Sequence, residues 1–268
     1  MSRQLLTFFV CCCFSIPQGF FSQIAIAQET KAEALRIIIF GAHPDDAEVH
    51  VGGLLALCAK RGLKAGILDL TSGDLGTRGT ATTRRAEAMK AADILGVERI
   101  ILTFPDARFD ESEPYRRAIM EVLRRTRPQV FVLPAPDDHH PDHRRAFRLG
   151  RDAAYYAGLK NYPCEGHPWR PRALAWVGGV NPTTVPDLVI DVSEVWDQRM
   201  AAFDSFESQF APDPEAPPTR IADPSFRAGI LGRSLHWGSL IAVPHAEGLW
   251  CEKPIPQALL RLVNRLNP

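Results

Sequence analysis

Two short segments of this sequence combine histidine with several carboxylates. Residues 41–48 read Gly-Ala-His-Pro-Asp-Asp-Ala-Glu, and residues 137–143 read Asp-Asp-His-His-Pro-Asp-His. A catalytic zinc ion typically takes three ligands from His, Asp or Glu and leaves a fourth position for water. His43, Asp46 and His143 fit that count. We therefore expect one Zn²⁺ per chain, held by these three side chains.

The remaining polar side chains of the two segments suggest how such a site would hydrolyse an amide. Zinc lowers the pKa of its water toward about 7 and polarises a bound carbonyl. Adjacent carboxylates usually point in different directions, so Asp45 is the candidate general base if Asp46 holds the metal. His140 is the candidate for protonating the departing amine or stabilising the oxyanion. Asp142 would fix the tautomer of a nearby imidazole.

Each segment also has an interpretation without catalysis. Pro and Asp favour turns, and Asp46 would serve as the cap of a following helix. In the same way, His139, His140 and His143 would lie in a solvated loop, with Asp142 as a helix N-cap. The presence of both segments, each directly after a predicted strand, favours a metal site.

An alternation of strand and helix patterns would bring the two segments together. It is typical of an α/β fold, here a Rossmann-like three-layer sandwich with a mostly parallel sheet and helices on both faces. Ligands bind outside the carboxyl ends of such strands, so residues 41–48 and 137–143 should share one crevice. A proline-rich loop is expected at 211–224, and Glu247 in a turn. The predicted strands are 36–40, 65–70, 99–102, 130–133, 174–177 and 188–192, and the predicted helices are 47–61, 83–95, 115–125, 146–156 and 195–206.

Overall charge and the N-terminal segment bear on partners and compartment. Lys plus Arg and Asp plus Glu number 31 each, so no broad field exists to attract nucleic acid or an anionic membrane. Arg3, the apolar run 5–16 and the small residues of 25–27 have the pattern of a signal peptide spanning 1–27, too short for a stable membrane span. Residues 28–268 would then form a single exported catalytic domain, periplasmic or extracellular. A wrongly assigned start would make the protein cytoplasmic.

The two segments resemble the signatures of the PIG-L or LmbE-like family of zinc-dependent sugar de-N-acetylases. GAHPDDAE resembles the first signature and HPDH the second. Further segments, among them Phe206 to Phe210 and Ala246 to Gly248, resemble the subgroup of bacillithiol-biosynthesis deacetylases. The resemblance implies that His43, Asp46 and His143 bind zinc, that Asp45 is the base, and that His140 with Asp142 forms the acid or oxyanion-stabilising pair.

The resemblance also implies a substrate and an assembly. The subgroup hydrolyses the acetamide of N-acetylglucosaminyl malate, giving acetate and the free glucosamine conjugate. Arg84 corresponds to a substrate-binding arginine of the family and would suit the malate carboxylates through bidentate pairing. The alternative for Arg84 is a charge on a solvated helix face beside Arg85 and Glu87. A small-molecule sugar is the expected partner, together with a homo-oligomer, often a hexamer in the family.

Some features depart from the subgroup and keep other functions open. Phe206 and His245 stand where tyrosines are expected, and members of the subgroup normally work in the cytoplasm. An exported N-acetyl-oligosaccharide deacetylase is therefore an alternative. A non-catalytic glycan-binding module is another. A nucleotide-binding oxidoreductase would begin with a similar strand and turn, but the required G-x-G-x-x-G is missing from this sequence.

Overall fold

The structure is a computed structural model that describes residues 36–179 and 182–266. The predicted signal peptide, residues 1–27, lies outside the described residues. The described part belongs to one compact unit, Ala32–Pro268. Among its helices we find none with the length and apolar character needed to cross a membrane.

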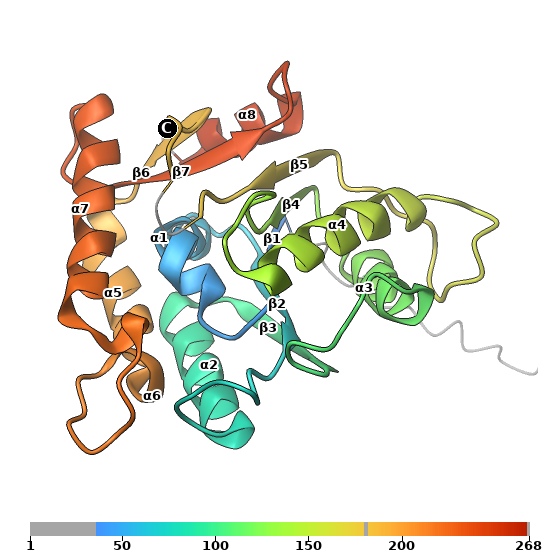
Figure 1. Cartoon of the computed structure of the whole chain (residues 1–268). Helices are drawn as coiled ribbons and strands as arrows, with labels where there is room; N and C mark the ends of the chain where they lie inside the picture. Colours follow the sequence, from blue (N-terminus) through green and yellow to red (C-terminus); the bar gives the residue numbers. More distant parts are fainter. Residues whose placement is uncertain (1–35, 180–181, 267–268) are drawn as a thin grey trace, which may run out of the picture. The chain divides into compact units, whose positions relative to one another are not determined.

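Strands and helices alternate along most of this unit (Figure 1). The strands are β1 (Ile37–Gly41), β2 (Ala65–Thr71), β3 (Glu98–Phe104), β4 (Val130–Leu133), β5 (Ala173–Trp176), β6 (Leu188–Asp191) and β7 (Ala246–Cys251). The helices are α1 (Asp46–Lys60), α2 (Ala81–Leu95), α3 (Glu113–Thr126), α4 (Pro141–Tyr156), α5 (Trp196–Asp204), α6 (Glu207–Phe210), α7 (Pro224–Leu240) and α8 (Gln257–Leu266), with short 3₁₀ turns η1 (Ser193–Val195) and η2 (Arg220–Ala222).

The strands form one sheet in the order β3-β2-β1-β4-β5-β7-β6. Strands β1 to β5 pair in parallel, whereas β7 lies antiparallel to both β5 and β6. The predicted α/β fold with a mostly parallel sheet is therefore confirmed.

Alternate residues of the central strand β1 pack into two separate hydrophobic cores. Ile37 and Ile39 belong to the core built with α1, α2, α5 and α8. Ile38 and Phe40 belong to the core built with α3 and α4. Helices thus cover both faces of the sheet (Figure 1), which explains why β1 is apolar at consecutive positions instead of at alternate ones.

The strand order reverses direction between β1 and β4, which lie side by side with Ile37 opposite Val130 and Ile39 opposite Val132. From β1 the chain continues outward to β2 and β3, and from β4 it continues outward on the other side to β5. Parallel α/β sheets bind ligands at such a switch point, outside the carboxyl ends of the strands. The segments that follow β1 and β4 are the two that carry the predicted chemistry.

Several expectations about individual elements are wrong. The helix predicted at 146–156 begins at Pro141, because proline is well suited to the first position of a helix. Glu247 lies in strand β7 and not in a turn. The loop expected at 211–224 is present at 211–219, whereas residues 220–222 form η2 and α7 begins at Pro224. Strand β7 is inserted between β5 and β6 by long-range pairing, which no local sequence pattern reveals.

Helix α4, which carries Asp142 and His143, approaches the sheet closely at Gly150. A Cβ atom at Gly150 would lie 2.7 Å from Leu133 Cδ2 and 2.7 Å from Phe40 Cε1. Gly150→Ala should therefore destabilise the protein by about 1–3 kcal/mol through overpacking, measured by urea unfolding.

Gly229→Ala is the matched control, because Gly229 lies in α7 with no atom within 4 Å of its added Cβ. This change should stabilise the protein by about 0.5–1 kcal/mol through helix propensity. Equal effects of the two substitutions would contradict the close packing of α4 on the sheet.

Candidate active site

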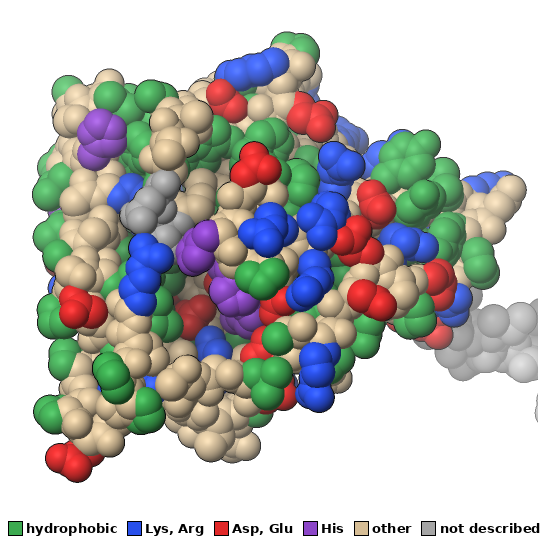
Figure 2. Space-filling view, viewed as in Figure 1, with side chains coloured by type: hydrophobic (Ala, Val, Ile, Leu, Met, Phe, Trp, Pro, Cys, Tyr) green, Lys and Arg blue, Asp and Glu red, His purple; other side chains and the backbone are tan. Residues whose placement is uncertain are grey.

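The two histidine-containing segments meet in one pocket outside the carboxyl ends of β1 and β4. Its volume is about 360 Å³. Figure 2 shows histidine side chains and carboxylates gathered in a hollow of this face, with Lys and Arg side chains beside it. Every site residue predicted from the sequence lines the pocket, namely His43, Asp45, Asp46, Arg84, His140, Asp142 and His143.

The turn after β1 is closed by the side chain of Asp46. Its Oδ2 accepts the backbone N–H groups of Ala42 at 2.8 Å and His43 at 3.0 Å. Asp45 adopts a left-handed conformation with φ of 114°, which Asp tolerates better than most residues. This tight turn brings the side chains of His43, Asp45 and Asp46 to the same edge of the sheet.

Asp46 lies between the two predicted histidine ligands. His143 Nε2 lies 3.2 Å from Asp46 Oδ1, and His43 Nδ1 lies 3.9 Å from Asp46 Oδ2. His43 and Asp46 follow β1, whereas His143 lies in the first turn of α4. The fold therefore brings this trio together from segments about a hundred residues apart in the sequence.

Carboxylates contact the ring nitrogen of each histidine that points away from Asp46. His43 Nε2 lies 3.1 Å from Asp106 Oδ1 and 3.3 Å from Asp142 Oδ2. His143 Nδ1 lies 3.1 Å from Asp138 Oδ2. Metal-binding histidines usually donate their second N–H to such a carboxylate, which fixes the tautomer and the ring orientation. His43 Nδ1 and His143 Nε2 are left on the side of Asp46.

The donor set fits a divalent cation of the zinc type, since imidazole nitrogen and carboxylate oxygen are its common ligands. Within the described residues, the donor sets whose ligand atoms all lie within 4.8 Å of one another are His43, His140 and His143, and His43, Asp106 and Asp142; the trio of His43, Asp46 and His143 is not among them. The second set uses the nitrogen of His43 that already meets both carboxylates. Those carboxylates also accept the N–H groups of Leu75 and Ala107, which favours an orienting role.

The electrostatics of the cluster favour positive charge beside Asp46. Burial opposes protonation of His43, yet Asp106, Asp142 and Asp46 raise its pKa to about 9. Burial likewise opposes protonation of His143, while Asp46 and Asp138 raise its pKa to about 10. The same carboxylates would stabilise a bound divalent cation.

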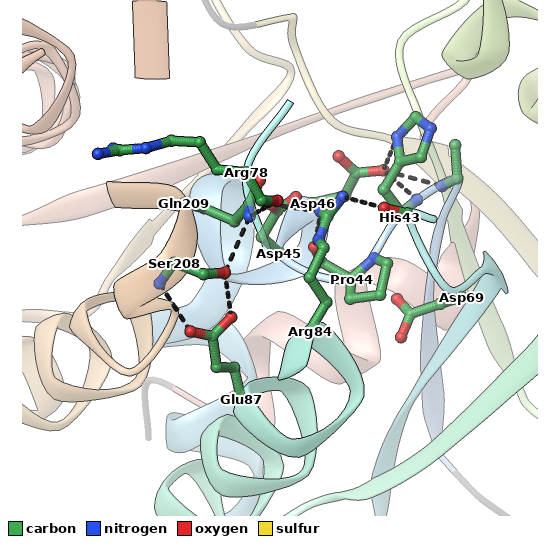
Figure 3. Close-up of polar contacts among 12 residues, drawn as sticks. His43, Pro44, Asp45, Asp46, Asp69, Arg78, Arg84, Glu87, Ser208 and Gln209 are labelled. Carbon is green, nitrogen blue, oxygen red and sulfur yellow. Dashed lines mark hydrogen bonds and ion pairs between the residues drawn. The ribbon is translucent and has the colours of Figure 1, made fainter. Parts of the chain in front are cut away.

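Arg84 of α2 points toward Asp45 (Figure 3). Its Nη2 donates to Asp45 Oδ2 at 2.9 Å and to Pro44 O at 2.7 Å, and its Nη1 donates to Gly73 O at 3.1 Å. Arg84 is only 5% exposed, so the alternative of a solvated helix-surface charge is wrong. Three protein acceptors already bind the guanidinium of Arg84. Contact of Arg84 with substrate stays a prediction.

Burial and Arg84 act in opposite directions on Asp45. Burial raises the pKa of Asp45 and the Arg84 charge lowers it, with a result of about 6. A carboxylate with a pKa near neutrality is suited to accept a proton at one step and release it at the next. A pKa of about 6 is thus compatible with the predicted role of Asp45 as a base.

His140 and Asp142 both lie beside His43 in this cluster. The His140 ring stacks on His143 with centroids 4.8 Å apart, and its Nδ1 accepts the N–H of Asp142 at 3.2 Å. The Asp142 carboxylate instead contacts His43. Asp142 therefore has the orienting contact expected of it, but with a histidine from the other segment.

Three polar residues near the pocket received no role from the sequence. Asp106 follows β3, and the rule that strand ends face the crevice would have found it. Asp138 was part of the second segment but was not distinguished from its neighbours. His50 lies one helical turn after Asp46 and lines the pocket, and burial lowers its pKa to about 3.

The wall of the pocket is held by contacts between α2, the loop after β2 and α6 (Figure 3). Ser208 Oγ donates to Glu87 Oε2 at 2.7 Å, and Gln209 Nε2 donates to Arg78 O at 2.8 Å. A Cβ atom at Gly79 would lie 2.7 Å from Ser208 Oγ, so the loop requires glycine there. Through these contacts the 206–210 segment supports the wall of the pocket.

Phe206 and His245, which depart from the subgroup pattern, lie outside the lining of the pocket. Phe206 is fully buried, with Arg99 packed over its ring at 5.7 Å from the centroid. His245 stacks on Trp196 at 4.1 Å. Neither substitution alters the lining of the pocket.

Comparison with known proteins agrees with this geometry. The profile of the PIG-L family, described as GlcNAc-PI de-N-acetylase, matches residues 38–154, which include both segments. Diacetylchitobiose deacetylase of Thermococcus kodakarensis is 28% identical over 235 residues, covering 80% of this chain and 82% of that protein. 4-Oxalmesaconate hydratase of Pseudomonas putida is 29% identical over 199 residues, covering 64% and 73%.

A solved structure extends the similarity beyond the matched profile. The conserved protein TT1542 from Thermus thermophilus is 34% identical, with a TM-score of 0.74, covering 83% of this chain and 96% of that one. On this evidence the chain belongs to the PIG-L family of de-N-acetylases.

Proposed function

We propose that this protein is a zinc-dependent hydrolase that removes the acetyl group from an N-acetylglucosamine conjugate. The observation that carries the proposal is the meeting of His43, Asp46 and His143 in one pocket, with Asp45 in the same turn. His43, Asp46 and His143 would hold one zinc ion per chain. When bound, zinc would polarise the acetamide carbonyl and lower the pKa of a water molecule.

The residues around this trio would handle the protons of the reaction. Asp45 would take the proton of the attacking water, and its contact with Arg84 keeps the carboxylate oriented in the pocket. His140 would deliver a proton to the amine nitrogen as the carbon–nitrogen bond breaks, or stabilise the oxyanion that precedes it. Asp106, Asp138 and Asp142 would hold the two histidine ligands in orientation.

We propose an N-acetylglucosamine sugar as the part of the substrate that is deacetylated. Two candidates remain for the group attached to that sugar. The subgroup resemblance favours N-acetylglucosaminyl malate. The Thermococcus kodakarensis relative favours a short N-acetylated oligosaccharide. Arg84 already donates hydrogen bonds to Asp45, Pro44 and Gly73, so its guanidinium is poorly placed to pair with the malate carboxylates. This favours a short oligosaccharide as the substrate. Assembly into a homo-oligomer is part of the proposal through family resemblance alone.

A screen of purified, zinc-supplemented protein would test the reaction. We expect release of acetate and a free amine from N-acetylglucosamine conjugates, with diacetylchitobiose and N-acetylglucosaminyl malate compared directly. Sugar binding without acetate release would support a glycan-binding module instead. Hydration of a conjugated double bond without acetate release would group the chain with its hydratase relative.

Asp45→Asn should lower kcat by about a hundredfold to ten-thousandfold, because the amide cannot accept a proton from water. Zinc content should be unchanged, since Asp45 is not among the proposed ligands. Acetate release and metal content would be measured on the same sample. Asp110→Asn, a change at an exposed position, is the control. Unaltered turnover of Asp45→Asn would remove Asp45 from this role.

Asp138→Asn should weaken zinc binding by about ten- to a hundredfold, because His143 loses the carboxylate that orients its ring. His143→Ala should weaken it further by removing a proposed ligand. Zinc affinity would be measured by competition with a chromogenic chelator, independently of any substrate. Equal affinities of wild type and both variants would contradict the proposed metal site.

A further inference from the structure

Helix α1 is broken between the turn that carries the site residues and the rest of the helix. Val51 has φ of −143° and ψ of 31°, outside the helical range. Residues 46–50 precede the break, and residues 52–60 follow it. Asp46 and His50, which both line the pocket, therefore belong to a short first turn whose direction differs from that of the longer second part.

A buried carboxylate from a distant part of the sequence caps the start of the second part of α1. Glu247 of β7 accepts the N–H of Gly53 on Oε1 at 2.9 Å and the N–H of Leu54 on Oε2 at 2.7 Å. Exposed N–H groups at a helix start favour negative charge, so the carboxylate stabilises a new helix start at this point. Glu247 is 4% exposed, and its contacts are made inside the protein.

Two arginines hold the end of the first turn. Arg199 Nη2 of α5 donates to Val49 O at 3.1 Å, and Arg233 Nη2 of α7 donates to the same oxygen. Arg199 Nε also lies 3.5 Å from Glu247 Oε1, which ties the two sides together. In a regular helix, Gly53 N–H and Val49 C=O would be partners. Here each of them has a charged partner from outside the helix.

The glycines at the break leave room for these groups. A Cβ atom at Gly53 would lie 3.0 Å from Glu247 Oε1 and 2.8 Å from Val192 Cβ. A Cβ atom at Gly52 would lie 3.3 Å from Arg199 Cγ. Paired glycines in a helix interior cost stability, so their presence here is explained by the close approach of Glu247 and Arg199.

The same group of side chains lines a small cavity that shares His50 with the active-site pocket. Glu247, Arg199 and Arg233 line this cavity together with His50, and its volume of about 10 Å³ is close to the minimum for one water molecule. His50 also lines the active-site pocket. A shift of Glu247 would therefore be transmitted to the turn that carries Asp45 and Asp46.

We propose that Glu247, supported by Arg199 and Arg233, is a positioning residue that sets the direction of the first turn of α1. By this contact strand β7 holds Asp45 and Asp46 at the angle that the site requires. The inference about catalysis rests on the proposed function. The inference about the position of the turn does not, and it is tested without substrate.

Glu247→Gln tests the proposal, because the amide retains one acceptor oxygen but loses the charge and the second acceptor. We expect backbone amides of residues 46–54 to exchange hydrogen about tenfold faster, and zinc affinity to fall about tenfold. With an active substrate, kcat should fall about tenfold while KM stays within about threefold, since the turn carries the proposed base and the proposed ligand Asp46. Glu252→Gln, at an exposed position just after β7, should match wild type in every measurement.

Gly53→Ala perturbs the same contact from the other side and keeps the test valid if Glu247→Gln does not fold. It should speed exchange in 46–54 and weaken zinc binding in the same direction. Wild-type exchange and zinc affinity in folded Glu247→Gln or Gly53→Ala would overturn the proposal. If wild type releases no acetate but the exchange and zinc effects occur, the proposed function fails and the positioning role stands.

Discussion

Strands β1 and β4 are parallel neighbours whose connections leave toward opposite edges of the sheet. This leaves a crevice outside their carboxyl ends that neither crossover covers. His43, Asp45 and Asp46 come from one side of the crevice, and His140, Asp142 and His143 from the other. A site assembled in this way depends on the pairing of two strands and on the packing of α4, whose first turn carries His143.

Buried charge is the second constraint. The buried carboxylates of Asp45, Asp106, Asp138 and Asp142 are crowded around two imidazoles together with the half-buried carboxylate of Asp46. Each carboxylate needs a donor or a positive charge to remain stable away from water. Backbone N–H groups, Arg84 and the histidines supply these partners. Farther down, Arg99 is bonded to both Asp69 and Glu48, and all three side chains are fully buried. Charge pairing thus continues from the pocket into the core beneath α1.

Elements from the later part of the chain contact the helix that carries the first site segment. Strand β7 enters the sheet antiparallel between β5 and β6 and brings Glu247 to the break in α1. Helices α5 and α7 bring Arg199 and Arg233 to the same point. The first turn of α1 is therefore held by Arg84 at Asp45 and by Arg199 and Arg233 at Val49, whereas Glu247 holds the start of the second part.

Local sequence patterns predicted the strands up to β6, most helices, the α/β class and six residues that line the pocket, whereas Arg84 was predicted from the family resemblance. These features are encoded by periodicity and by polar residues at strand ends, which act over a few residues. Only the tertiary structure decided that Asp142 orients His43, that Arg84 binds Asp45, and that Glu247 lies in a strand beside α1. Those contacts join residues 39 to 194 positions apart, and which partners meet depends on strand order and helix packing that no single segment encodes.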